Sequence, residues 1–182
     1  MRTIKKILVP IDFCEESASA FLHALGLAKE ARAELIVLHV IDSYALRNFF
    51  LPATEDIERP TLDRLNASLL SLDTLRSKKA LALSTFINKH ARVHGGIVIT
   101  RKVRMGGVVK EIAATAWEEN IDLIVVELRK RFPFLNLTVL RLLQLSRKLP
   151  CPVLLEPAVS KGGRTAMGRL ISPRAFPRER VA

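Results

Sequence analysis

The sequence predicts an α/β fold in which a doubly wound, Rossmann-like parallel sheet of five strands carries helices on both faces. Short apolar runs rich in branched residues recur along the chain, separated by longer stretches with apolar residues three or four positions apart. The short runs are typical of strands buried on both faces of a parallel sheet, and the longer stretches are typical of amphipathic helices. Their regular alternation predicts βαβ units with right-handed crossovers.

The first βαβ unit lies at the start of the chain. The apolar run Ile7–Ile11 predicts a buried strand that ends at Asp12. A helix is expected from about Glu15 to Ala31, because acidic residues fill its first turn and apolar residues follow at helical spacing. A second buried strand at 35–41 completes the unit.

The later elements continue the alternation. A long apolar stripe predicts a helix that begins at 62 and ends before Gly95, either continuous or broken near Asp73. The other expected elements are an irregular segment at 43–61, strands at 97–103, 122–126 and 152–155, and helices at 108–119 and 135–148. The helix at 135–148 has little polar surface, so it either packs on the sheet or presents an apolar face to a partner.

The positive charge is concentrated in the last third of the chain. The net charge is +11, yet residues 1–126 carry 17 basic and 15 acidic side chains, whereas 127–149 and 157–182 each carry six basic and one acidic. We expect one domain at 1–156 and a basic C-terminal tail at 157–182 that is disordered or only locally ordered. The basic third can attract nucleic acid or an anionic membrane surface, or it can serve as a solubilising fringe.

Cysteine usage and hydropathy place limits on compartment and chemistry. Cys14 and Cys151 are far apart, which argues against a disulfide framework or a zinc site and fits a reducing cytosol. We expect a cytoplasmic protein, because neither a secretory signal nor a transmembrane segment of roughly 20 apolar residues is visible. The sequence shows no Ser–His–Asp or paired-carboxylate arrangement, so we expect no catalytic residue, no metal site and no enzymatic activity.

Five sequence blocks, in this order, resemble a known family. They are residues 7–13 (ILVPIDF), 38–40 (LHV), Gly106 before a helix, 122–125 (DLIV) and 150–154 (PCPVL). Over residues 4–156 the chain resembles the universal stress protein family. The resemblance implies a sheet of strand order 3-2-1-4-5 and a homodimer, commonly formed through the last strand. Some members of this family bind ATP and others do not.

The resemblance also implies where a nucleotide would lie. ATP-binding members place an Asp at the end of the first strand, near the adenine and ribose, which matches Asp12 here. The residue at the end of the second strand lines the base, which matches Val40. Pro10 and Gly106, from the matching blocks, complete this half of the candidate cofactor-binding set.

The phosphate half of the site departs from the family pattern. The family motif G-x2-G-x9-G-[ST] follows the fourth strand, and its first two glycine positions here hold Glu127 and Lys130. The third glycine falls on Val139 or Leu140, and the Ser/Thr position on Leu140 or Arg141. Glycines let a backbone approach phosphate and present its N–H groups, so their loss predicts no cofactor and no ATP binding in the family's usual mode.

Three functional hypotheses follow. The first is a non-enzymatic, homodimeric stress-response or regulatory module that acts through protein contacts of the helix at 135–148, the last strand and the loop at 44–50. The second is an ATP-binding member with an unorthodox phosphate site at Lys130 and Arg131. The third is a peripheral binder of anionic surfaces that uses the basic tail.

Three residues near the first two strands have competing interpretations. Asp12 either binds a nucleotide or positions the first helix. Cys14 either responds to oxidants at a helix N-terminus or replaces the usual Ser as a helix cap. His39 lies in a buried strand, and we expect it to be a core residue with a hydrogen-bond partner and not a ligand.

Overall fold

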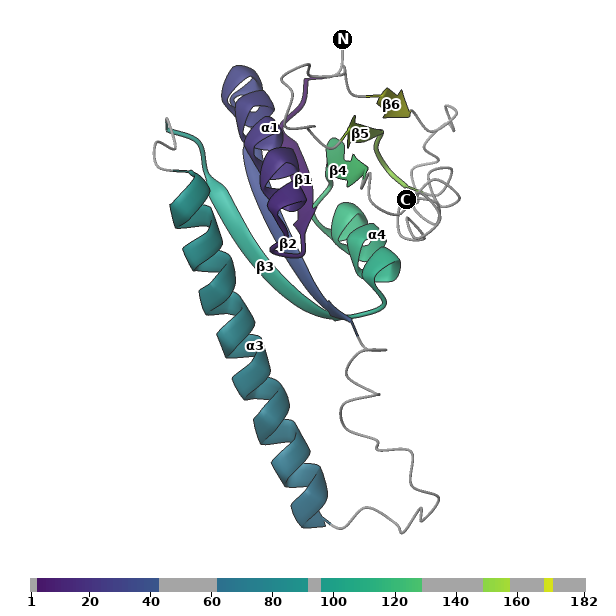
Figure 1. Ribbon diagram of the computed structural model, residues 1–182. Coiled ribbons are helices and arrows are strands. Elements are labelled where there is room, and N and C mark those ends of the chain that lie inside the picture. The colour runs from purple at the N-terminus through teal and green to yellow at the C-terminus, as the bar shows by residue number, and fades with distance from the viewer. Residues whose placement is uncertain (1–2, 43–61, 92–95, 129–148, 158–168, 172–182) are drawn as a thin grey trace.

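A computed structural model shows six strands in one sheet of order β3-β2-β1-β4-β5-β6, with α1 and α3 on one face and α4 on the other (Figure 1). The structure describes residues 3–42, 62–91, 96–128, 149–157 and 169–171. The strands are β1 (Lys6–Ile11), β2 (Glu34–Asp42), β3 (Ile99–Gly106), β4 (Leu123–Leu128), β5 (Val153–Pro157) and β6 (Arg169–Ile171); the helices are α1 (Glu15–Ala31), α3 (Leu62–His90) and α4 (Val108–Glu118). The first five strands are parallel, which confirms the predicted fold class and the order 3-2-1-4-5.

The core has two halves because successive residues of each strand point to opposite faces of the sheet. Ile7, Val9 and Ile11 of β1 pack toward α1 and α3. Leu8, between the first two, packs toward α4 on the other face. Right-handed crossovers account for this arrangement, since the chain moves outward from β1 to β3 and then returns to place β4 on the other side of β1.

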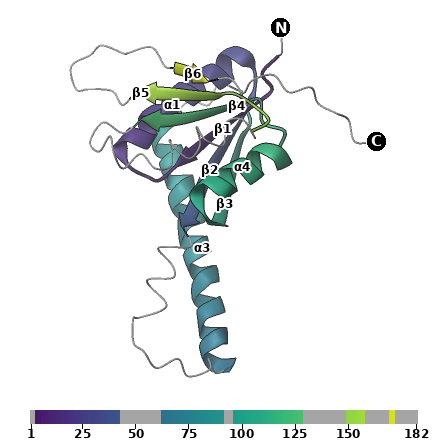
Figure 2. The same ribbon diagram turned by 90° about the vertical axis from the view of Figure 1, so that its right-hand side faces the viewer.

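The long helix α3 is continuous through Asp73, and only part of its length packs on the sheet. Leu83, Phe86 and Ile87 join the core shared with α1. The ring of Phe86 meets Phe21 of α1 edge to face, with 5.6 Å between ring centroids. The amino-terminal turns of α3 extend well beyond the sheet (Figures 1 and 2). Among the described residues, no helix combines the length and the apolar character that a membrane span requires.

The sixth strand corrects the expectation that the sheet ends at β5. β6 comes from the predicted tail and pairs antiparallel with β5 through Val153↔Ile171, Leu154↔Leu170 and Leu155↔Arg169 (Figure 2). The tail is thus locally ordered at 169–171, because the outer edge of β5 supplies backbone hydrogen-bond partners that a short segment can use. The edge predicted to form a dimer contact is therefore occupied by the chain's own β6. The predicted helix at 135–148 and the loop at 44–50 lie outside the described residues.

Phe21→Ala tests the packing between α1 and α3. Phe21 is fully buried, whereas its neighbour Leu22 is 48% exposed. The Phe21→Ala variant should lose about 3–5 kcal/mol of unfolding free energy, because truncation of a buried ring leaves a cavity. The control, Leu22→Ala, removes a side chain of the same helix that the core does not enclose, so a much smaller loss is expected. Urea unfolding followed by circular dichroism measures both, and equal losses would contradict this description of the core.

Candidate functional site

The structure brings four of the predicted site residues to the carboxyl-terminal edge of the sheet. Pro10 and Asp12 lie at the end of β1, Val40 near the end of β2, and Gly106 at the end of β3. The parallel register places Val40 beside Arg104 and Gly106 beside Asp42. This edge is where ligands bind in open α/β sheets. Lys130 and Arg131 lie outside the described residues.

Asp12 participates in the turn that starts α1. Its Oδ1 accepts a hydrogen bond from the backbone N–H of Cys14 at 3.2 Å. The Sγ of Cys14 in turn accepts from the N–H of Ser17 at 3.3 Å, and the Ser17 hydroxyl donates to the carbonyl of Cys14 at 3.0 Å. Cys14 is therefore the N-cap of α1, and the positioning role considered for Asp12 is observed.

Phe13, between these two residues, has backbone dihedrals that are rare for its type. Its φ is +67°, in the left-handed region that costs a residue with a Cβ on the order of 1 kcal/mol or more. The ring compensates by packing: it lies 4.3 Å from the His39 ring and 6.0 Å from that of Phe86, centroid to centroid. The ammonium of Lys79 lies 5.5 Å from the centroid of the Phe13 ring. No local sequence pattern predicts this cluster, because its members come from the turn after β1, from β2 and from α3.

His39 is the buried member of this cluster that packs on Phe13, and it is 6% exposed. Its Nδ1 donates a hydrogen bond to the carbonyl of Ile11 at 3.0 Å, which confirms the expected core role. Burial lowers the pKa of His39 below its usual value, the hydrogen bond to Ile11 opposes this shift, and the positive charge of Lys79 adds to it. The imidazole of His39, next to the end of β1, is therefore neutral at neutral pH.

Gly106 is needed here for packing. A Cβ at this position would lie 2.5 Å from the Oε1 and 2.9 Å from the Cγ of Glu111. The backbone φ of Gly106 is +157°, a value that residues with a Cβ rarely adopt. The side chain of Glu111, from the first turn of α4, thus occupies the space that the glycine leaves. Its carboxylate lies 3.5 Å from the Nε of Arg104. The open side of this glycine therefore faces a protein carboxylate, which disfavours an approaching phosphate.

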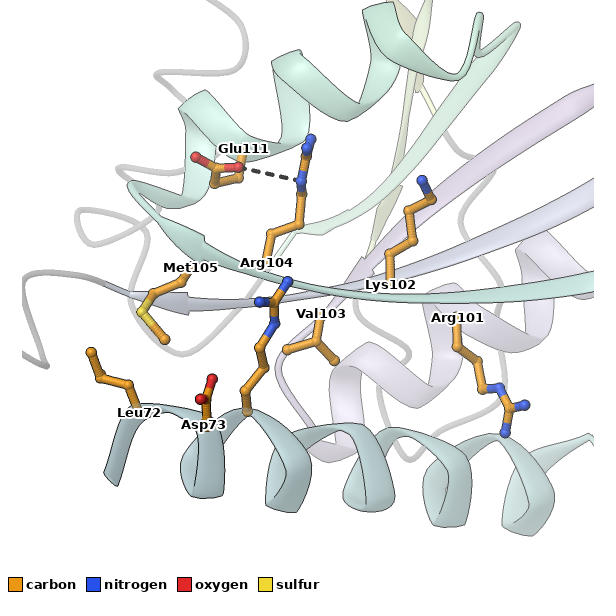
Figure 3. A pocket seen from close by; sticks show the side chains of 9 residues that line it. Leu72, Asp73, Arg101, Lys102, Val103, Arg104, Met105 and Glu111 are labelled. Carbon is orange, nitrogen blue, oxygen red and sulfur yellow. Dashed lines mark ion pairs between the residues drawn. The ribbon is translucent and has the colours of Figure 1, made fainter. Parts of the chain in front are cut away.

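A cleft of about 810 Å³ lies next to this position, between α3, β3 and the start of α4. Figure 3 shows β3 running between the two helices, with Lys102 and Arg104 directed toward α4 and Arg101, Val103 and Met105 toward α3. The charged lining consists of Arg76, Arg101, Lys102, Arg104, Asp73 and Glu111. Basic residues therefore outnumber acidic ones in this cleft.

Two of the four cations on the cleft are neutralised by α4 and the residue after it. Arg104 contacts Glu118 at 2.8 Å and donates to the hydroxyl of Thr115 at 3.1 Å, in addition to its pair with Glu111. Lys102 forms a short hydrogen-bonded ion pair with Glu119. This contact is the main cause of the lowered pKa of Glu119, and Lys6 contributes to it.

The other two cations have no carboxylate partner in the part of the chain that the structure describes. Arg101 donates to the hydroxyl of Ser84 at 2.9 Å and is exposed. Arg76, exposed on α3, has neither a hydrogen bond nor an ion pair with the described residues. The cleft is therefore asymmetric: the cations on its α4 side are paired with carboxylates, whereas on its α3 side Arg76 and Arg101 outnumber the single carboxylate of Asp73. The described residues form no group of three His, Cys, Asp or Glu that could hold a metal ion.

Comparison with known proteins identifies the same family as the sequence blocks. Residues 3–156 match the model of the universal stress protein family. A universal stress protein family structure from Burkholderia pseudomallei is 24% identical, with a TM-score of 0.57 over 86% of this chain and 98% of the other. Curated proteins give no significant match.

Two further structures of similar fold are described as nucleotide complexes. A universal stress protein in complex with cAMP is 18% identical, with a TM-score of 0.58 over 87% of this chain and 100% of the other. The universal stress protein from Archaeoglobus fulgidus in complex with dAMP is 15% identical, with a TM-score of 0.51 over 85% and 98% of the two chains. At these identities the likeness establishes the fold alone.

The buried His39 gives a testable pH dependence. Because the pKa of His39 is lowered in the folded state, the unfolded chain takes up a proton below about pH 6.5 that the folded chain does not. The free energy of unfolding therefore decreases as the pH is lowered through this window. His39→Gln should reduce that slope by at most about 1.4 kcal/mol per pH unit. Urea unfolding at several pH values between neutral and mildly acidic measures the slope. An unchanged slope in the variant would show that His39 does not cause it.

Proposed function

The chain belongs to the universal stress protein family, and on that premise we propose that it is a non-enzymatic regulatory module that acts through protein contacts and does not bind ATP in the family's usual mode. A cytoplasmic location is part of the same proposal. The observation that carries it is the replacement of the glycine motif after the fourth strand. Those glycines let backbone N–H groups approach a phosphate, so their replacement argues against the usual phosphate cradle.

Three features of the described residues support this proposal. The first glycine position of the motif, Glu127, lies inside β4, in register with Glu156 of β5. The carboxylate of Asp12 accepts a hydrogen bond within its own turn. Glu111 occupies the space beside Gly106. Asp12 and Glu111 thus engage with the chain's own groups at the edge where a nucleotide would have to bind, and a residue with a Cβ replaces the first glycine of the motif.

The alternative is an adenine-nucleotide site with an unorthodox phosphate end. Asp12, Val40 and Gly106 share the carboxyl-terminal edge of the sheet, and two structures of similar fold are described as complexes with cAMP and dAMP. Lys130 and Arg131 follow β4 in sequence and would supply charge for the phosphates. A point charge attracts phosphate but does not reproduce the directed N–H groups of a glycine cradle.

We also propose that the chain forms a homodimer through the last strand, on the condition that the edge of β5 is free. Because β6 pairs with the outer edge of β5, the backbone of that strand can meet a second copy only when β6 has left. We propose that the tail and a second copy compete for this edge, so that the covered form is a monomer at this contact.

Nucleotide binding is tested by equilibrium dialysis with labelled ATP and cAMP in the presence of Mg²⁺. The proposal predicts no saturable binding below millimolar concentrations. Micromolar binding that Asp12→Ala abolishes would contradict it, and further loss in Lys130→Ala and Arg131→Ala would support the alternative site. Asp12→Asn is the matched control, because it keeps an oxygen acceptor for Cys14 and removes only the charge.

Competition for the edge of β5 is tested with two truncations. A chain that ends at 157 lacks β6 and should dimerise at concentrations where the full chain is monomeric, because it exposes unpaired backbone groups. A chain that ends at 171 keeps β6 and should behave like the full chain. Sedimentation equilibrium measures the three association constants. Equal constants for all three would show that β6 does not control this contact.

A further inference from the structure

The outer edge of β3 is open in the described structure. β3 is eight residues long and pairs with β2 alone among the described strands. Its second row of backbone N–H and C=O groups therefore lacks a strand partner within the described residues, which is the template that an added strand uses. The cleft of about 810 Å³ runs along this edge between α3 and α4.

The side chains beside this edge differ between its two sides. On the α4 side, Lys102 and Arg104 are held in ion pairs with residues of α4 and the position after it. On the α3 side, Arg101 donates a hydrogen bond to the hydroxyl of Ser84 and has no carboxylate partner among the described residues. Arg76 of α3 adds a second cation, so the two cations outnumber the single carboxylate of Asp73 on this side. Figure 3 shows the labelled residues of β3 pointing alternately toward the two helices.

We propose that this edge binds an extended acidic peptide, which adds to β3 as a further strand and carries carboxylates at alternate positions. Alternate side chains of a strand point to the same face, so residues i, i+2 and i+4 of the peptide face Arg101 and Arg76. The intervening residues face the neutralised α4 side and carry no charge. The proposal rests on the proposed function through protein contacts, and it adds the place of one contact and the chemistry of its partner.

Charge disfavours the other occupants of the edge. A second copy of β3 would bring its own Arg101, which has no carboxylate partner among the described residues, toward Arg101 and Arg76 of the first copy, and like charges across a strand pair are destabilising. The lining of the cleft includes no aromatic residue on which a base could stack.

The test uses fluorescence anisotropy of the full chain with labelled peptides of about ten residues, the upper length of a typical strand. The first peptide alternates Thr and Glu, and it should bind. The second has the same composition with all Glu in one block, and the third is the alternating peptide with N-methyl groups on alternate backbone nitrogens. Both should bind about tenfold more weakly or not at all, because the second loses the alternation and the third loses strand pairing.

Variants of exposed residues then locate the site. Arg101→Glu and Arg76→Glu should each weaken binding of the alternating peptide by about tenfold, because each reverses a cation that lacks a carboxylate partner. Lys110→Glu is the matched control, since Lys110 is an exposed cation of α4 outside the cleft. Circular dichroism checks the fold of each variant.

Several results would overturn the inference. These are equal binding of the block or N-methylated peptide, equal losses in the three variants, equal binding of a single-stranded oligonucleotide of the same charge, or no binding of the alternating peptide. The outcome is separable from that of the dialysis experiment. Tight ATP binding would overturn the proposed function while leaving the peptide site standing, and absence of peptide binding would remove this site while leaving the ATP prediction intact.

Discussion

The burial of β1 on both faces of the sheet is the constraint on which the other elements depend. β1 lies between β2 and β4, and its register with β2 runs from Lys6↔Glu34 to Ile11↔His39. A shift of one residue would exchange the side chains facing α1 and α3 with those facing α4. Because Ile7, Leu8 and Val9 are all fully buried, such a shift would mismatch both halves of the core at once. The register of β1 thereby fixes where its carboxyl end, and the turn that follows, must lie.

The turn after β1 is held in place by contacts within the protein, which do not require a phosphate motif. The strained Phe13 is held by its contacts with His39 and Phe86, and Asp12 and Cys14 connect β1 to the first turn of α1. These interactions stabilise the domain with or without a nucleotide. The role of Asp12 in the turn that starts α1 is therefore sufficient to explain an Asp at this position. The residue does not by itself imply a ligand.

The sequence was sufficient for features that depend on local periodicity and not for those that depend on distant side chains meeting. The apolar run Ile7–Ile11 and its counterparts predicted the five parallel strands, and the sequence blocks implied their order. The match of Asp12 and Val40 to the family placed them at one edge of the sheet. Other contacts join residues that are far apart in the sequence, and no local pattern predicts them. They are the cluster of Phe13, His39 and Lys79 and the ion pair of Glu111 with Arg104. The strand β6 was missed because three residues are too few for any periodicity.

The two edges of the sheet are protected by different physical means, and this difference bears on function. At one edge the chain covers β5 with its own β6, which pairs with the backbone of that strand. At the other edge, no described strand covers β3, and the positive charge of Arg101 and Arg76 opposes pairing with a second copy of the same edge. Lys102 and Arg104 are tied to α4, so the charge left over belongs to Arg101 and Arg76 on a single side. An edge with charge on one side selects for the pattern of an incoming strand as well as for its net charge. The proposed peptide site therefore depends on two properties of β3 together, an open row of backbone groups and a positive charge confined to one side of the strand.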